Sequence, residues 1–500
     1  MKLPRSFYSW TTAAGAALAF ISLMLIIFMM TISFIFGIGD NYTGLFTFII
    51  LPVFLIIGLI MIPIGAIRKA KKIKKLEGDD EEFKFPIVNL NEPSQRTAVF
   101  IFGLGSTIFL LFSAIGSYEA FHYSESVEFC GTLCHTVMEP EYVAYQNSSH
   151  AKVSCVTCHV GPGAGWYVKS KMSGIYQLYA VTAGVYPRPI KTPIKDLRPA
   201  RETCEQCHWH EKFYARQLIT KRHYLADETN SEWDIHLNIK TGPSLSALGL
   251  QEGIHWHINP DVKIEYIATS PQIDEIPWVR YTNTKTNEVF VYEDADNPLD
   301  SIELYKDKIR TMDCIDCHNR PSHHYRNPID FVDDALASGR ISSDLPEIKL
   351  MSMQVVTPEF PTKDSAMHYI ESELMTYYED NYPEVFETQK HLLTQAVNTL
   401  QEEFNKNIFP YMGVRWDVYP SHLGHVETVG CARCHNDRHT TADNRVISRD
   451  CNLCHIIKAQ GPPDNLVIDS TMQGLEFQHP VDIDGEWKVS LCTDCHEQLY

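Results

Sequence analysis

Residues 431–455 read CARCHNDRHTTADNRVISRDCNLCH and contain the same five-residue unit, Cys-X-X-Cys-His, twice. The unit recurs along the 500-residue chain, in six copies at Cys155–His159, Cys204–His208, Cys314–His318, Cys431–His435, Cys451–His455 and Cys492–His496. A seventh copy, Cys130–His135 (CGTLCH), has three residues between its cysteines. All 14 cysteines belong to these units, so the units account for the entire thiol content of the chain.

The histidine after each second cysteine indicates what the units bind. A zinc ribbon or a redox dithiol uses paired cysteines but does not require this histidine seven times, and a disulfide framework has no use for it. Covalent attachment of haem c needs two thiols at the porphyrin edge and a histidine on the iron. We therefore predict seven haems c, attached through Cys130, Cys134, Cys155, Cys158, Cys204, Cys207, Cys314, Cys317, Cys431, Cys434, Cys451, Cys454, Cys492 and Cys495, with His135, His159, His208, His318, His435, His455 and His496 as axial ligands.

Three uncharged stretches near the N-terminus are long enough to cross a bilayer. They lie within residues 6–39, 41–67 and 97–118, and a transmembrane helix needs about 20 apolar residues. We predict helices over about 12–36, 44–67 and 97–118, which together form a membrane anchor over 1–118. A cleaved signal peptide is the alternative for the first stretch, but its apolar run exceeds the length usual for such peptides.

The charges between the stretches predict their orientation. Arg68–Lys75 (RKAKKIKK) carries six basic residues, whereas the loop Gly37–Gly44 carries none. Basic loops stay in the cytoplasm, so the N-terminus is expected to be cytoplasmic and residue 119 to emerge outside. All seven motifs follow that point, as expected of a multi-pass protein in the bacterial inner membrane with a periplasmic haem domain.

The chain after residue 118 is acidic and irregularly patterned. The whole chain has a formal charge of −19, and residues 1–118 carry ten Lys/Arg and seven Asp/Glu, so the remainder carries −22. This balance argues against nucleic-acid binding and suits a basic soluble partner. The motifs follow no period, so we expect a mainly α fold with many loops, in which short helices wrap the porphyrins.

Two segments between the motifs have patterns of their own. Val262–Ala268, Trp278–Thr282 and Glu288–Tyr292 are rich in strand-forming residues and predict a small β-rich insert. Lys363–Asp380 and Pro383–Asn407 carry apolar residues at helical spacing and predict helices, with a scaffold or dimer contact as their role.

Seven irons need a second axial ligand each, and fifteen histidines lie outside the motifs. The favoured candidates are His150, His223, His323, His425, His439 and His479. His324 competes with His323 and His422 with His425, while His255 and His257 in the β-rich insert are less favoured. Met138 follows His135 by three residues and is a candidate ligand of the first haem, where it would raise the potential; alternatively it only packs against the ring.

Residues around the first four motifs resemble the NapC/NirT/NrfH family of membrane quinol dehydrogenases. The resemblance rests on EFCGTLCHTVMEP (Glu128–Pro140), on CVTCH at the second motif and on CIDCHNRPSH (Cys314–His323), all after a membrane span. This chain departs from the family in its three spans, the longer first motif, an insert of about 90 residues and three further haems. With seven haem motifs and three spans, the chain resembles the heptahaem ImcH-like branch of the family.

The resemblance implies a domain order and a function. It implies a four-haem domain over 119–323 with an insert over about 224–313, a helical segment over 324–430 and a three-haem segment over 431–500. Family members oxidise quinol beside the first haem, near a lysine and an acidic residue, which correspond here to Lys171 and Gln177. Because an amide accepts no proton, Glu119, Glu125 and Glu128 are candidate replacements.

The function implied is oxidation of menaquinol from the membrane quinone pool in anaerobic respiration. Electrons would pass through the haems to periplasmic c-type cytochromes or a terminal reductase. Two other functions stay open: a multihaem reductase of a small nitrogen oxyanion, which needs a haem with an open side, and a non-catalytic electron-wire subunit of a larger membrane complex.

Overall fold

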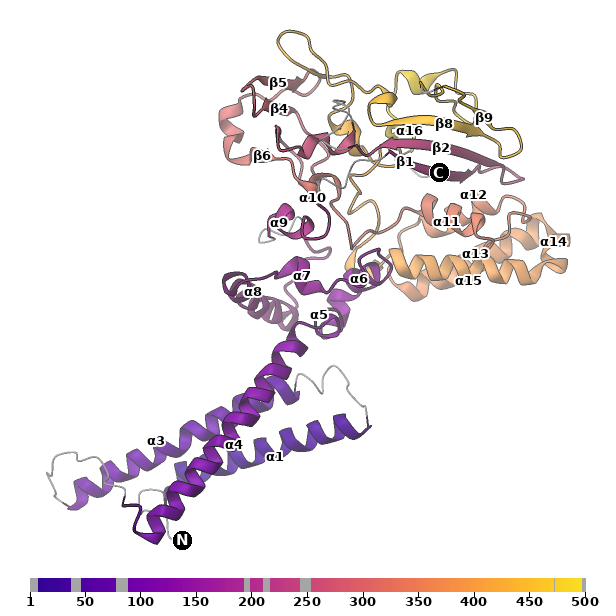
Figure 1. Cartoon of the computed structure of the whole chain (residues 1–500). Coiled ribbons are helices and arrows are strands. Elements are labelled where there is room, and N and C mark those ends of the chain that lie inside the picture. The colour runs from indigo at the N-terminus through magenta and orange to yellow at the C-terminus, as the bar shows by residue number, and fades with distance from the viewer. Residues whose placement is uncertain are drawn as a thin grey trace. The chain divides into compact units, whose positions relative to one another are not determined.

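The computed structural model describes residues 8–36, 46–77, 89–192, 198–209, 216–242, 253–471 and 473–496. The chain divides into two compact units (Figure 1). The first comprises Met1–Met138 with Ser154–Val156, and the second comprises Glu139–Val153 with Thr157–Tyr500.

Three long apolar helices dominate the first unit and confirm the predicted spans. They are α1 (Trp10–Phe36), α3 (Leu51–Glu77) after the short turn η2 (Phe46–Ile50), and α4 (Pro93–Ser124). The segments long and apolar enough to cross a membrane are Trp10–Ile32, Leu51–Ile73 and Gln95–Ser124. The loop Gly37–Gly44, used above for the orientation, lies outside the described residues.

Small residues let α1 and α3 approach closely. A Cβ atom added at Gly15 would lie 2.7 Å from Met61 Cβ, and one added at Gly58 would lie 2.6 Å from the backbone nitrogen of Ala19. In a bilayer the hydrophobic effect does not drive apolar helices together. They associate through van der Waals contacts, which such close packing provides.

Each motif with the standard spacing begins on a short helical turn. The turns are α7 (Cys155–His159), α9 (Ala200–Cys204), α10 (Cys314–Cys317), η7 (Gly430–Arg433), η8 (Cys451–Leu453) and α16 (Thr493–His496). The His208 N–H donates to the Cys204 carbonyl at 2.8 Å, and the His318 N–H donates to the Cys314 carbonyl at 2.8 Å. One helical turn therefore brings both thiols and the imidazole to the same side.

Longer helices flank the first two motifs. The first motif spans α5 (Val127–Thr132) and the start of α6 (His135–Gln146), and α8 (Ala164–Ala183) follows the second motif. Four short 3₁₀ turns complete the described helical elements: η4 (Ile254–Ile258), η5 (Ile302–Lys308), η6 (Pro410–Met412) and η9 (Glu486–Lys488).

The β-rich insert forms most of a five-stranded antiparallel sheet. Its order is β6-β3-β4-β5-β7, with β3 at Val262–Ile267, β4 at Trp278–Asn283, β5 at Val289–Asp294, β6 at Arg310–Thr311 and β7 at His439–Thr440. The three predicted strands correspond to β3, β4 and β5. The short edge strand β7 comes from beyond the fifth motif, so this sheet joins the insert to the C-terminal segment.

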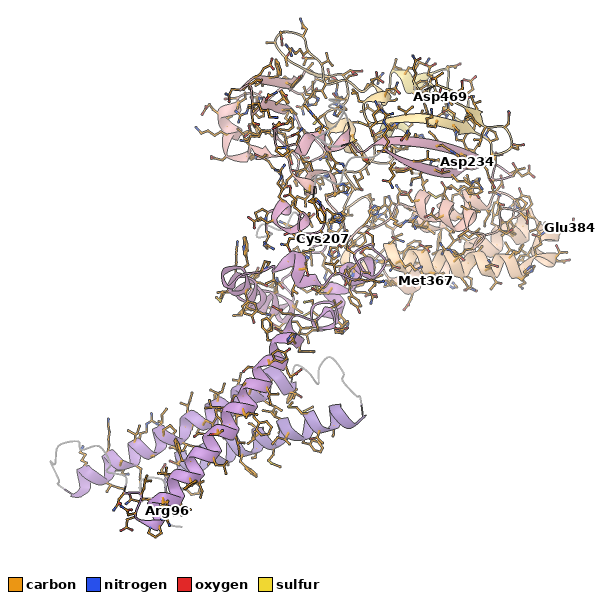
Figure 2. The ribbon with its side chains drawn as sticks, in the orientation of Figure 1. Arg96, Cys207, Asp234, Met367, Glu384 and Asp469 are labelled. Carbon is orange, nitrogen blue, oxygen red and sulfur yellow. The ribbon has the colours of Figure 1, made fainter. Side chains whose placement is uncertain are left out.

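A second sheet was not predicted. It has the order β1-β2-β8-β9, with β1 at Arg216–Tyr224, β2 at Glu232–Lys240, β8 at His455–Gly461 and β9 at Val467–Ile468. Two carboxylates of this sheet region are labelled in Figure 2. Asp234 pairs with Arg222 at 2.7 Å, and Asp469, just after β9, pairs with Lys458 at 2.5 Å. Strand β8 begins at the histidine of the sixth motif, so its pairing with β2 also positions that motif.

The predicted helical segment forms a small helical bundle beside the second sheet, where α11 packs against β1 (Figure 1). Its helices are α11 (Pro328–Ala337), α12 (Ile348–Val356), α13 (Lys363–Asn381), α14 (Pro383–Thr388) and α15 (Lys390–Asn407). Fully buried apolar residues such as Ile370, Leu374 and Leu400 make up its core. This core lies among helices that carry no haem motif, so the bundle provides a rigid apolar support.

Replacing Leu400 with alanine is expected to destabilise the bundle by about 2–5 kcal/mol, because the change removes buried methyl groups and leaves a cavity. The readout is amide hydrogen exchange of α13 and α15, which reports local opening. Glu371→Ala, at an exposed position of α13, is the control and should leave exchange unchanged. Equal protection in the two variants would contradict the assigned core.

Candidate haem-binding sites

Six of the seven motif histidines face a second histidine at nearly the same separation. The ring-centre distances are 6.1 Å for His159–His323, 6.0 Å for His208–His150, 6.4 Å for His318–His255, 5.9 Å for His435–His257, 6.1 Å for His455–His425 and 6.1 Å for His496–His479. Two imidazoles on opposite faces of one iron place their centres roughly 6 Å apart, because each metal–nitrogen bond is about 2 Å long. The six pairs fit bis-histidine haem ligation.

Hydrogen bonds at Nδ1 orient most of the second histidines. The acceptors are backbone carbonyls: Pro321 for His150 at 3.0 Å, Thr241 for His255 at 2.9 Å, Ile254 for His257 at 2.8 Å, Glu141 for His323 at 3.0 Å and Val481 for His479 at 2.7 Å. An imidazole that donates from Nδ1 carries its lone pair on Nε2, which is the arrangement of metal-ligating histidines. These five rings are therefore oriented as metal-ligating histidines are.

Burial keeps the imidazoles of several pairs neutral. It lowers the pKa of His455 to about 4, with the neighbouring His425 and Lys240 as smaller causes. Burial also lowers the pKa of His257 and of His318. Only the neutral ring ligates a metal, so this environment favours the form that the predicted chemistry requires.

One large cavity runs through the second unit past five motifs. Its volume is about 3260 Å³, and its walls include Cys204, Cys314, Cys431, Cys451 and Cys492, the first cysteines of motifs three to seven. Pockets for a single small ligand measure about 300–1,000 Å³. None of the 14 cysteines, all of which lie within the described residues, forms a disulfide; Cys207 of the third motif is labelled in Figure 2. The cavity and its thiols fit several adjoining porphyrins.

Neighbouring motifs are also in direct contact. The Cys204 and Cys314 side chains bring the third and fourth motifs within interaction distance of each other. Arg433 Nη2 of the fifth motif donates to the Asp316 carbonyl of the fourth at 2.8 Å. His425 Nδ1, which belongs to the sixth pair, lies 3.8 Å from Cys492 Sγ of the seventh motif. The sites therefore adjoin one another along the cavity.

The structure brings four of the six favoured non-motif histidines opposite a motif histidine: His150, His323, His425 and His479. It does not do so for His439, which is fully buried. The His439 Nδ1 atom lies 3.0 Å from Asn436 Oδ1, and its Nε2 atom lies 2.6 Å from the Ile276 carbonyl. Neither ring nitrogen of His439 is left for a metal.

His223 lies in the cavity wall but is likewise not opposite a motif histidine. Its Nδ1 atom lies 3.2 Å from Asp333 Oδ2, and Lys349 Nζ binds Asp333 Oδ1 at 2.6 Å. The two remaining positions opposite motif histidines are occupied by His255 and His257. Two histidines two residues apart were the one weak signal in the sequence that this segment binds haem. Only the fold shows that His255 and His257 face different motifs.

The first motif differs from the others. His135 begins α6, and the Met138 N–H donates to the Cys134 carbonyl at 3.0 Å. Among the described residues, no histidine pairing of the kind above involves His135. The side chains of Cys130 and Cys155 lie close together, so the first two motifs also adjoin. Met138 remains the candidate ligand at this motif.

Three membrane-crossing helices with seven Cys–His units, six of them facing a second histidine, define a membrane-anchored multihaem c-type cytochrome. Residues 92–218 match the N-terminal region of the NapC/NirT cytochrome c family. The chain is 41% identical over 495 residues to the cytochrome c-type protein ImcH of Geobacter sulfurreducens, covering 98% of this chain and 95% of that protein. This chain therefore belongs to the NapC/NirT cytochrome c family, on its ImcH-like branch, which confirms the resemblance.

A second relative matches a shorter part of the chain. The cytochrome c-type protein NrfH of Wolinella succinogenes is 29% identical over 167 residues, which is 31% of this chain and 92% of that protein. No solved structure matches. Nearly all of this relative therefore corresponds to about a third of the present chain.

The pairing at the seventh motif predicts different results for two variants. His479→Ala should convert one haem of the oxidised protein from low spin to high spin, because His496 loses its opposing imidazole. His223→Gln should leave every haem low spin, although His223 lies in the same cavity. Electron paramagnetic resonance (EPR) spectroscopy at matched haem content makes the comparison. A high-spin signal in His223→Gln alone would reverse the assignment.

Proposed function

We propose that this protein oxidises menaquinol at the outer face of the bacterial inner membrane and passes electrons through seven haems c to periplasmic cytochromes or a terminal reductase. The observation that carries the proposal is the set of six histidine pairs, each at the separation of two imidazoles on one iron. An iron ligated on both faces transfers electrons and binds no substrate. Haem c supplies a carrier of single electrons when it is bound.

Four of the second ligands in this proposal were predicted from the sequence: His150, His323, His425 and His479. Each faces the histidine of a different motif, and carbonyls orient three of the four rings. Met138 is proposed at the first motif, where a thioether ligand would raise the potential relative to a second imidazole. The domain order given above also remains part of the proposal.

Helix α8 supports the proposed access of quinol from the membrane. Val168, Met172, Ile175 and Tyr179 lie on one face of this helix, and each is about 60% exposed (58%, 63%, 63% and 60%). Residues at these helical spacings line one side, and a contiguous exposed apolar patch marks contact with lipid or an apolar ligand. A lipid-soluble quinol is such a ligand.

Lys171 is the proposed polar group for quinol on this helix. Its Nζ atom lies 5.0 Å from the ring centre of Tyr167, which holds the ammonium beside an aromatic face. Oxidation of a quinol releases two electrons and two protons, so the site needs proton acceptors beside an electron acceptor. The Gln177 side chain donates to Ser173 Oγ at 3.2 Å and does not titrate. We therefore propose that a carboxylate accepts the protons and that Gln177 has a positioning role.

The orientation in the membrane rests on the basic segment Arg68–Lys75 at the end of α3. By the positive-inside rule, uncharged spans are oriented so that such a basic segment lies in the cytoplasm. The N-terminus is then cytoplasmic, and the motifs, which all follow α4, are periplasmic. Periplasmic acceptors fit the acidic surface of this part of the chain, because an acidic surface steers basic partners toward it.

The two other functions make different demands. A reductase of a nitrogen oxyanion needs an iron with an open face, yet six motif histidines already face a second imidazole. An electron-wire subunit needs no quinol site and would not use Lys171. Direct reduction of the purified protein by quinol separates the second function from the proposal.

Replacing Lys171 with glutamine is expected to slow haem reduction by a soluble menaquinol analogue about tenfold, which corresponds to about 1.4 kcal/mol of barrier. The measurement is stopped-flow haem absorbance of the full chain in lipid nanodiscs. Lys169→Gln is the matched control, since Lys169 also lies over an aromatic ring of α8, that of Trp166. Dithionite should reduce all three proteins equally.

Two outcomes would overturn parts of this proposal. If menaquinol analogues fail to reduce the unmodified protein, it is an electron-wire subunit instead of a quinol dehydrogenase. If Lys169→Gln and Lys171→Gln are equally slow, the effect is one of general charge on α8, and Lys171 has no specific role.

A further inference from the structure

The β-rich insert presents two histidines to two different motifs. They are His255 and His257, which flank Trp256 on the single turn η4. The His255 ring lies 6.4 Å from that of His318, and the two planes meet at 7°. The His257 ring lies 5.9 Å from that of His435, with the planes at 86°. Three consecutive residues of one turn therefore reach both the fourth and the fifth motif.

Packing of the central tryptophan fixes this turn on the sheet. The Trp256 ring stacks on Tyr281 at 5.5 Å and 12°, and Tyr281 stacks on Phe290 at 5.9 Å and 13°. The Gly253 residue before the turn has φ +115°, which a residue with a side chain rarely adopts. The two flanking imidazoles thus project from a backbone that the five-stranded sheet holds in place.

The two motifs that the turn reaches are themselves clamped together. The Arg433 guanidinium is buried within the fifth motif and donates to the Asp316 carbonyl of the fourth at 2.8 Å. It also donates to the Ile273 carbonyl of the insert at 2.8 Å. Tyr266 on β3 donates to Asp316 Oδ1 at 2.8 Å. Insert, fourth motif and fifth motif therefore form one hydrogen-bonded body.

Two other histidines near these motifs, His439 and His422, are not available as ligands. Both ring nitrogens of His439 are engaged, as described above. The His422 Nε2 atom lies 2.9 Å from the Gln272 carbonyl, and its Nδ1 atom lies 3.1 Å from the Asp316 carbonyl. By contrast, His255 and His257 each direct Nδ1 toward a backbone carbonyl, that of Thr241 at 2.9 Å and that of Ile254 at 2.8 Å, which is the orientation of metal-ligating histidines.

We infer that the turn His255–Trp256–His257 supplies the second axial ligand at two consecutive haem sites, His255 at the fourth motif and His257 at the fifth. Each Nε2 lone pair forms a coordinate bond to ferric iron, and no electron or proton is transferred in that step. The insert thereby links the four-haem part of the chain to the C-terminal three-haem segment. It fixes the distance between the fourth and the fifth haem sites. This inference rests on the proposed haem loading but not on quinol oxidation.

EPR spectroscopy of the oxidised full chain tests the assignment. Near-parallel imidazole planes give a rhombic low-spin signal, and near-perpendicular planes give a highly anisotropic one at larger g. His255→Ala should therefore remove one rhombic signal, and His257→Ala one highly anisotropic signal, each with one new high-spin haem. Added imidazole should restore the low-spin state in both. His439→Gln is the matched control at the fifth motif and should change neither class of signal.

Haem content measured by intact mass guards against misfolding. If His257→Ala does not retain all seven haems, His257→Met is used, and a Met–iron charge-transfer band in the visible spectrum is then the expected result. The inference is overturned if His257→Ala stays fully low spin at full haem content, or if His439→Gln produces the high-spin haem. Either result leaves reduction of the unmodified protein by menaquinol untouched, so the two proposals fail separately.

Discussion

The separation of about 6 Å between facing imidazoles is the constraint on which the second unit depends. A histidine fixed by its own motif can be opposed only by a ring delivered from another part of the chain. His150 lies before the second motif and faces the third, while His323 follows the fourth motif and faces the second. The loops, sheets and short helices between motifs are arranged so that these rings meet.

The two sheets and the helical bundle serve this arrangement. Strand β8 begins at the histidine of the sixth motif, and its pairing with β2 holds that histidine in place. The pairing of β5 with β7 holds the segment that follows the fifth motif. Asp333 on α11 holds His223 at the cavity wall, and the buried Lys349 balances the charge of that carboxylate. A buried ion pair of this kind costs desolvation energy, and the 2.6 Å contact between the two charges and the hydrogen bond from the Tyr224 N–H to Asp333 help to offset that cost.

Local chemistry could be predicted from the sequence, and distant pairing could not. Each motif is a single helical turn, so its two thiols and its histidine follow directly from the spacing. The three spans follow from length and hydropathy. His439 was favoured because it lies four residues after His435, yet strand pairing buries it and backbone and side-chain acceptors take both of its nitrogens. His257 was less favoured because its partner His435 is 178 residues away along the chain, a distance across which a single sequence carries no pairing signal.

The order of these rings along the chain has a consequence for biogenesis. For the third to seventh motifs the facing histidine precedes the motif, so in the proposed topology it is exported before the motif emerges from the translocon. The second motif is the exception, because His323 emerges after the next two motifs have done so. With the proposed ligands, a haem attached early at the second motif would lack the His323 ligand until residue 323 had been exported. Completion of that site therefore reports that the first four motifs have been exported and folded together.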